Sequence, residues 1–151
     1  MKRDIHGKEL FEAFIRIRKH LKTERFFKRL NFSEMIVLRM LWQRRVEGEP
    51  ALLQVKDLSE KMGFSRPALN TVLNRLEDKG LIRRVRKPDD RRAVFVEMSA
   101  EADELYKKEK EKLSGFLNRI VEKLGTGDAE KAIDILNKLY NIMKNEVDYN
   151  A

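Results

Sequence analysis

Residues 63–99 read GFSRPALNTVLNRLEDKGLIRRVRKPDDRRAVFVEMS, and this stretch decides the predicted fold. It predicts a helix that opens at Ser65, with Ser65 or Arg66 as its cap, and that ends at Gly80, because serine caps helix starts and glycine ends helices. A cationic strand over 81–87 and a return strand over 93–98 follow, joined by the five residues between them. A helix with a polar outer face followed directly by a basic hairpin is typical of a winged helix-turn-helix that binds DNA.

The helix predicted over 65–79 has one apolar face and one polar face. The apolar face is expected to point inward and consists of Leu69, Val72, Leu73 and Leu76. Asn and Arg on the opposite face suit base edges, because Asn can bind adenine and Arg can bind guanine through two hydrogen bonds. The candidate DNA-binding residues of this helix are Ser65, Arg66, Pro67, Asn70, Thr71, Asn74 and Arg75.

The predicted hairpin is strongly cationic, since residues 83–92 hold six Lys and Arg side chains against two Asp. A solvated charged face is the alternative explanation, but the strand–turn–strand context favours contact with DNA. Arginine at a wing tip can enter a narrow minor groove, and the remaining cations are expected to bind phosphates. The candidate DNA-binding residues of the wing, taken as 83–96, are Arg84, Arg86, Lys87, Arg91 and Arg92.

The rest of the chain predicts helices separated by short breaks. Ser33 is the expected cap of the second helix, whose inward residues are predicted to be Ile36, Val37, Met40 and Leu41. Ser99 is expected to cap a long helix, and residues 125–128 are expected to break it. The predicted helices are 5–29, 33–45, 56–62, 99–124 and 129–147, with a short strand at 51–55. The terminal helices carry more apolar surface than one small domain can cover, which favours a homodimer; packing of these helices within one chain is the rival explanation.

The amino-acid composition of the 151-residue chain limits which ligands and activities can be expected. A net charge of +8 at pH 7 favours an anionic partner. Zero cysteine excludes a disulfide framework and a thiolate zinc site, and the isolated His6 and His20 do not suggest a metal. No run is apolar enough for a membrane span, and no signal-peptide core is present, so we expect a cytoplasmic protein. With no catalytic constellation and no phosphate loop, neither an enzyme nor a bound cofactor is expected.

The run Leu76 to Arg84, followed by Asp90-Arg91-Arg92 and then Met98-Ser99, resembles the winged-helix core of MarR-type regulators. The resemblance implies a mainly α fold with a small β wing (α+β), in which 33–99 form the DNA-binding core. It further implies that 1–31 and 100–151 form intertwined dimerisation helices of a single domain. Each subunit would read half of a palindromic operator.

The resemblance also implies residue roles. It gives Arg92 the wing-tip contact, Asp90 the role of holding Arg92, and the helix from Ser65 to Arg75 the reading role. Several members have Arg where this chain has Thr71, so the target sequence does not carry over. Base readout is then expected from Asn70, Asn74 or Arg75.

A small aromatic acid is the effector that the resemblance implies, held between the DNA-binding lobe and the dimerisation helices. The candidate lining residues are Phe11, Phe14, Arg18, Phe26 and Trp42, for each of which a place in the core is the alternative. We expect a repressor that occludes a promoter. The alternatives are a chromosome-coating protein of the same fold without sequence preference, and a winged-helix module that binds protein; the outward Asn and Arg side chains disfavour the latter.

Overall fold

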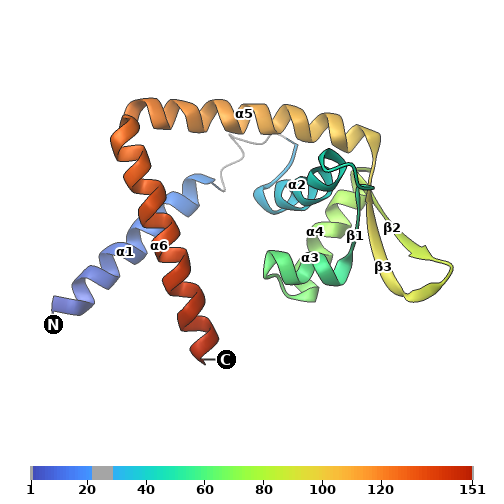
Figure 1. The fold of residues 1–151 in the computed structure, drawn as a ribbon, viewed down its shortest axis with the longest axis horizontal. Coiled ribbons are helices and arrows are strands. Elements are labelled where there is room, and N and C mark those ends of the chain that lie inside the picture. The colour runs from blue at the N-terminus through green and yellow to red at the C-terminus, as the bar shows by residue number, and fades with distance from the viewer. Residues whose placement is uncertain (1, 22–28, 151) are drawn as a thin grey trace. The chain divides into compact units, whose positions relative to one another are not determined.

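The computed structural model describes residues 2–21 and 29–150, and it is mainly helical with one small sheet (Figure 1). The chain forms two compact units, Met1–Lys110 and Glu111–Ala151. The helices are α1 (Lys2–Leu21), α2 (Phe32–Val46), α3 (Val55–Met62), α4 (Arg66–Asp78), α5 (Ala100–Leu124) and α6 (Thr126–Asn150). The strands are β1 (Leu52–Gln54), β2 (Ile82–Lys87) and β3 (Asp90–Met98). The predicted mainly α fold with a small wing is confirmed.

The three strands form an antiparallel sheet in the order β1-β3-β2, so β2 is an edge strand. Leu53 of β1 lies opposite Val96, and Arg84 of β2 lies opposite the same residue on its other side. The hairpin of β2 and β3 extends beyond the helices of the winged core (Figure 1). The outer end of the hairpin is therefore not covered by those helices (Figure 1).

The core of the winged domain lies where α4 packs against α2 and β2. All four predicted inward residues of α4 are buried, which confirms the face assigned from their spacing. They lie in a core with fully buried side chains from α2, α3 and β3, which include Leu38, Leu58 and Val96. The opposite face of α4 is left free for contact with a ligand.

Helix α4 ends in a turn that fixes the direction of the wing. Gly80 adopts φ +72, a left-handed conformation that glycine takes without strain. The amide of Gly80 donates to the carbonyl of Glu77, and that of Leu81 donates to Leu76. These two bonds form a Schellman motif, which brings the start of β2 back beside the last turn of α4.

The prediction that Ser33 caps α2 is wrong, because Asn31 is the cap. The Asn31 carboxamide accepts from the Glu34 amide at 2.8 Å, and the Asn31 amide donates to the Glu34 carboxylate at 3.0 Å. This reciprocal pair satisfies two helix-end donors, which a hydroxyl at Ser33 does not do. Glu34 thereby becomes buried, and the apolar inward residues are Met35, Val37, Leu38 and Leu41, while Ile36 and Met40 are half-buried.

The predicted break over 125–128 is also wrong in length, because α6 already begins at Thr126. Gly125 alone, at φ +82, separates α5 from α6. Asp128 falls in the first turn of α6, where a carboxylate is stabilised by the helix dipole. At the other end of the chain, α1 begins at Lys2, before the predicted start at 5, and most of the predicted helix beyond Leu21 lies outside the described residues.

The described helices contain no segment long and apolar enough to cross a lipid bilayer. Within the same residues, no group of three or more His, Asp or Glu side chains is placed to hold a metal ion.

Candidate nucleic-acid interface

The tip of the hairpin is tighter than the sequence predicts. Only Pro88 and Asp89 form the turn, so the predicted turn over 88–92 is wrong and β3 begins at Asp90. The register explains the difference: Arg86 lies opposite Val94, and the next pair is Lys87 with Asp90. The residues between Asp90 and Val94 therefore bulge out of the ladder, which a sequence pattern of alternating residues does not reveal.

Side chains hold this bulge in place. The Asp90 carboxylate accepts the backbone amide of Arg92 at 3.1 Å, and the Arg86 guanidinium donates to the Arg91 carbonyl at 3.1 Å. Both Arg91 and Arg92 remain exposed. Asp90 thus contacts Arg92 through the backbone of the bulge, leaving the guanidinium of Arg92 available.

The N-terminal turn of α4 follows the expected chemistry. The Ser65 hydroxyl accepts the Ala68 amide at 3.3 Å and caps the helix. The Thr71 hydroxyl donates to the Pro67 carbonyl one turn earlier at 3.1 Å. Ser65 and Thr71 therefore both use their hydroxyls within the helix, and the polar side chains free to reach a partner from the first two turns of α4 include Arg66 and Asn70.

A polar hollow of about 750 Å³ lies between α4, the wing and the start of α3. It brings together residues that are far apart in the sequence. Its charged and polar lining consists of Gln54, Lys56, Arg66, Asn70, Arg84, Arg86, Asp90 and Arg92. The hollow therefore joins the predicted reading helix to the predicted wing in one cationic surface.

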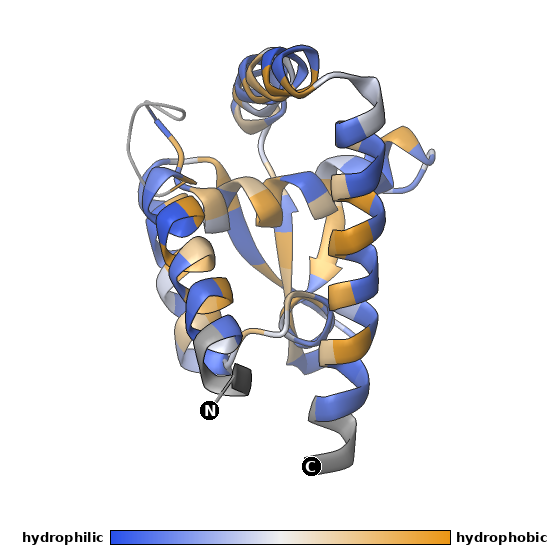
Figure 2. Cartoon of the chain, turned by 90° about the vertical axis from the view of Figure 1, so that its left-hand side faces the viewer, coloured by the Kyte–Doolittle hydropathy of each residue, from blue (hydrophilic) through white to orange (hydrophobic). Residues whose placement is uncertain are grey.

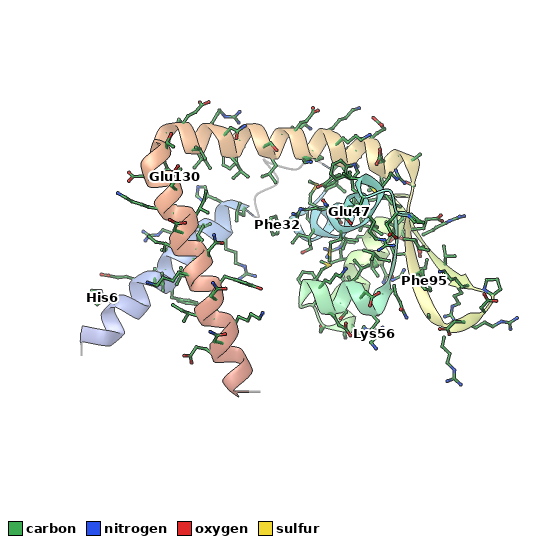
Figure 3. All side chains as sticks on the ribbon, viewed as in Figure 1. His6, Phe32, Glu47, Lys56, Phe95 and Glu130 are labelled. Carbon is green, nitrogen blue, oxygen red and sulfur yellow. The ribbon has the colours of Figure 1, made fainter. Side chains whose placement is uncertain are left out.

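Two residues of this lining, Gln54 and Lys56, are missing from the sequence prediction. They lie where β1 passes into α3, and Lys56 occupies the first turn of α3 (Figure 3). Nothing in the local pattern around Lys56 distinguishes it from an ordinary surface lysine. Only the approach of α3 to the wing gives it a role.

Arg84 differs from the other predicted DNA-binding arginines, because its guanidinium is bound to side chains of α4, whereas that of Arg86 donates to the Arg91 carbonyl within the hairpin. The Arg84 guanidinium donates to the Asn74 carboxamide oxygen at 2.8 Å and to a Glu77 carboxylate oxygen at 3.2 Å. The second Glu77 oxygen accepts the backbone amide of Arg84 at 3.1 Å. Strand β2 is thus tied to the last two turns of α4.

The alternation of the strand separates the cations of β2 into two faces, as expected. Arg84 and Arg86 line the hollow, whereas Arg83 lies 2.6 Å from Glu97. The Lys87 ammonium lies 4.6 Å from the centre of the Phe95 ring, a cation–π contact. The described lining of the hollow does not include the other predicted DNA-binding residues, which are Ser65, Pro67, Thr71, Asn74, Arg75, Lys87 and Arg91.

The junction between α2 and α5 contains Trp42, one of the predicted effector residues. The Trp42 ring lies 5.3 Å from that of Tyr106 at 47°, and the Lys110 ammonium lies 4.2 Å from its centre. Phe11 and Phe14 are exposed on α1, as is Arg18, and Phe26 lies outside the described residues.

An ion pair completes the same junction. Asp103 of α5 lies 2.9 Å from Arg45 of α2 and 2.9 Å from Lys107. Burial raises the pKa of Asp103, but Lys107 and Arg45 together lower it by more, so the net pKa lies below its ordinary value. The pKa of Lys107 is raised in return by its hydrogen bond to Asp103. The start of α5 is thus fixed to α2 by both charge and aromatic contact.

Comparison with known proteins places this arrangement in a family. The MarR family profile matches residues 30–94. The HTH-type transcriptional regulator FarR of Neisseria gonorrhoeae is 31% identical over 98 residues, which are 65% of this chain and 67% of FarR. The chain spans 58% and 54% of the uncharacterized regulators YfiV and YdgJ of Bacillus subtilis, respectively.

Solved structures show the same fold. A mutant of MarR from E. coli in complex with operator DNA matches with a TM-score of 0.73 at 18% identity, over 91% of this chain and 95% of that one. NadR in complex with 4-hydroxyphenylacetate matches with a TM-score of 0.59 at 27% identity, over 84% of this chain and 89% of that one.

The fold and the cationic hollow define a winged helix-turn-helix protein of the DNA-binding class. The chain belongs to the MarR family, whose members are transcription regulators and not enzymes.

Proposed function

We propose that the chain is a homodimeric repressor that binds a palindromic operator. Helix α4 enters the major groove, and the wing over 83–96 reaches the adjacent minor groove. The observation that carries this proposal is the cationic hollow, because it presents Lys56, Arg66, Arg86 and Arg92 on one surface. Such a surface fits a phosphate backbone, and α4 beside it fits a major groove.

The roles within the interface follow from position. Ser65, Pro67 and Thr71 shape the first turns of α4, while Arg66 and Asn70 face the hollow. Arg75 is exposed on the next turn and is a candidate for base contact. Arg91 and Arg92, exposed on the bulge that Asp90 holds, are the wing-tip contacts, and Lys87 supplies a phosphate contact at the outer edge of the wing.

The proposal of a homodimer is supported by apolar surface on the helices outside the winged core. On α1, Phe11 and Ile17 are 62% and 60% exposed, and on α6, Leu136 and Tyr140 are 59% and 64% exposed. Orange apolar residues recur between blue polar ones along the helix that ends at the C label (Figure 2). An amphipathic helix in water needs a partner for its apolar stripe, and a second copy of the chain provides one.

Twofold symmetry then fixes the geometry on DNA. Two copies of α4 enter successive major grooves about 34 Å apart, one helical turn of the duplex. Such a dimer occludes a promoter that contains its operator. It acts in the cytoplasm, where the DNA is.

A small aromatic acid is the proposed effector. NadR is described in complex with 4-hydroxyphenylacetate, and this chain is 27% identical to it. Trp42 at the α2–α5 junction, with Phe11, Phe14, Arg18 and Phe26, provides the aromatic and cationic side chains that such a ligand needs. Titration of the Trp42 fluorescence with 4-hydroxyphenylacetate tests this part, since Trp42 is the single tryptophan of the chain.

A protein that coats the chromosome without sequence preference is the second candidate. The cations of the wing favour it, because phosphate contacts alone would satisfy them. Selection of bound DNA from a random-sequence pool at about 150 mM salt separates the two candidates. Recovery of one inverted repeat supports the dimeric regulator, whereas binding with no recovered motif supports the coating protein.

A further inference from the structure

Arg84 is the one cation of residues 83–92 whose side chain is substantially covered. It is 26% exposed, against 75% for its neighbour Arg83, and the remaining cations of this segment are exposed. A phosphate contact needs a guanidinium that can reach the DNA and release counterions. We propose that Arg84 is instead a positioning residue, which fixes the wing to α4 and sets the orientation of the Asn74 carboxamide. This inference rests on the proposed function as a sequence-specific regulator.

The first part of the argument is the pairing with Glu77. One Glu77 oxygen accepts the Arg84 guanidinium at 3.2 Å, and the other accepts the Arg84 backbone amide at 3.1 Å. Because β2 is an edge strand, this amide has no partner strand on its outer side, and Glu77 supplies the missing acceptor. The charge of Arg84 is therefore balanced within the chain, and β2 is held at a fixed distance from α4.

The second part is the chemistry of Asn74. A guanidinium has donors and no acceptor, so the atom of Asn74 that faces Arg84 must be the carboxamide oxygen. The Asn74 NH2 group is then the part left for other partners. Bidentate recognition of adenine needs both the oxygen and the NH2 of asparagine, and here Arg84 occupies one of the two lone pairs of the oxygen and fixes the plane of the carboxamide. Asn74 in this state selects a base edge that offers acceptors, as guanine does through O6 and N7.

Both parts lead to one functional consequence. Loss of the Arg84 side chain frees the Asn74 oxygen and leaves only the backbone amide of Arg84 bonded to Glu77, which loosens the wing on α4, although the other cations that line the hollow remain. Sequence discrimination should fall while the electrostatic attraction to DNA stays nearly unchanged. A phosphate contact predicts the opposite pattern.

The test compares Arg84→Lys and Arg84→Ala with Arg86→Lys and Arg86→Ala, because Arg86 lies on the same strand face and lines the same hollow. Lysine keeps the charge but lacks the coplanar N–H donors with which the guanidinium binds Asn74 and Glu77 at the same time. Affinities for the selected operator and for operators with single-base changes are measured across a range of salt. Circular dichroism and thermal unfolding establish that each variant is folded, and Glu77→Gln serves as a milder change should Arg84→Ala unfold.

We expect Arg84→Lys to lose about tenfold in discrimination at one base pair of each half-site, a 1.4 kcal/mol effect, with the dependence of affinity on salt unchanged. The double variant with Asn74→Ala should be no worse than Asn74→Ala alone in discrimination, because both changes remove one coupled unit. Arg86→Lys should leave discrimination intact, because a lysine ammonium can still donate to the Arg91 carbonyl that Arg86 bonds. Arg86→Ala should lower the salt slope by about 1.8 per dimer, which is about 0.9 for each phosphate that is no longer neutralised.

Two results overturn the inference. One is a uniform loss of affinity in Arg84→Ala with a salt slope lowered by about 1.8, restored by Arg84→Lys, since that is the behaviour of a phosphate contact. The other is additivity of Arg84→Ala and Asn74→Ala. If the wild-type chain shows no sequence preference, the proposed function as a sequence-specific regulator fails. The salt slopes of the Arg84 variants on random-sequence DNA still decide whether Arg84 is a positioning residue or a phosphate contact. The failure of the proposed function is therefore distinguishable from the failure of this inference.

Discussion

Replacement of Arg92 by alanine should weaken DNA binding by reducing counterion release, without unfolding the protein. Arg92 is exposed on the bulge of β3 and lines the cationic hollow, and its side chain forms no ion pair among the described residues. We therefore expect its guanidinium to contribute to DNA binding and little to the stability of the free chain.

The magnitude follows from the cations of the hollow. Excluding Arg84, which Glu77 balances, four cations line it: Lys56, Arg66, Arg86 and Arg92. These four cations alone neutralise about eight phosphates per dimer, which contributes about −7 to the slope of log affinity against log salt and a loss of about 10⁴ in affinity between 50 and 200 mM salt. Arg92→Ala removes about two of these phosphate contacts per dimer, so the slope should become less steep by about 1.8 and the affinity at about 150 mM salt should fall by about 30-fold.

Fluorescence anisotropy of a labelled operator at five or more salt concentrations measures both quantities. Arg83→Ala is the matched control, because it changes the net charge equally but removes a residue that pairs with Glu97 on the other face of β2. We expect the control to keep the wild-type slope.

An Arg92→Ala dimer that is folded and keeps the wild-type slope would refute the reasoning, since it would remove the wing tip from the interface. Equal loss in Arg83→Ala would refute it differently, because the effect would then belong to the overall charge and not to the hollow.

Three further predictions concern the dimer, the ion pair and the turn. Leu136→Glu on α6 should shift the chain toward monomer in sedimentation velocity, whereas Asn137→Glu, at an exposed polar position, should not; a dimeric Leu136→Glu would argue against this face as the interface. The depressed pKa of Asp103 means that its ion pairs stabilise the fold above about pH 4 and are lost as the pH falls through the folded value. Asp103→Asn should therefore lower the free energy of unfolding by only about 1 kcal/mol at neutral pH, since the partners of Asp103 are half exposed. Urea denaturation at several pH values should show a smaller loss of stability below about pH 4 in the variant than in the wild type. An equal loss in both proteins would contradict this prediction. Gly80→Ala should lower the free energy of unfolding by about 1 kcal/mol, because the φ of +72 at this position disfavours a side chain. Urea denaturation measures this change, and an unaltered midpoint would show that the turn relaxes without cost.

Local sequence signals were sufficient for the winged core. The spacing of Leu69, Val72, Leu73 and Leu76 predicted the buried face of α4, and the Ser65 cap and the Gly80 stop predicted its ends. These signals succeed because they depend on helix periodicity and on backbone chemistry within a few residues. The prediction of the α2 cap failed because Asn31 and Ser33 are both residue types that cap helices well. Only the pair of hydrogen bonds between Asn31 and Glu34 decides between them.

The candidate site depended on contacts that no local pattern encodes. Whether a wing cation faces DNA or a carboxylate is decided by the register of β2 on β3 and by the approach of β2 to α4. Arg84 and Arg86 have the same residue type, strand and face, yet Glu77 and Asn74 engage only the first. Lys56 lines the hollow because α3 lies beside the wing in the folded chain, which is again a contact between segments distant in the sequence.

The sequence by itself thus determined the class of fold, the two faces of α4 and a cationic hairpin, because each is a property of short segments with characteristic spacing. The tertiary structure alone decided which cations remain available to DNA. That choice depends on distances between segments that are distant along the chain, such as Glu34 with Lys79 at 2.8 Å and Glu77 with Arg84 at 3.2 Å. A charge is free or balanced according to what the fold places beside it, and packing of the whole domain sets those neighbours.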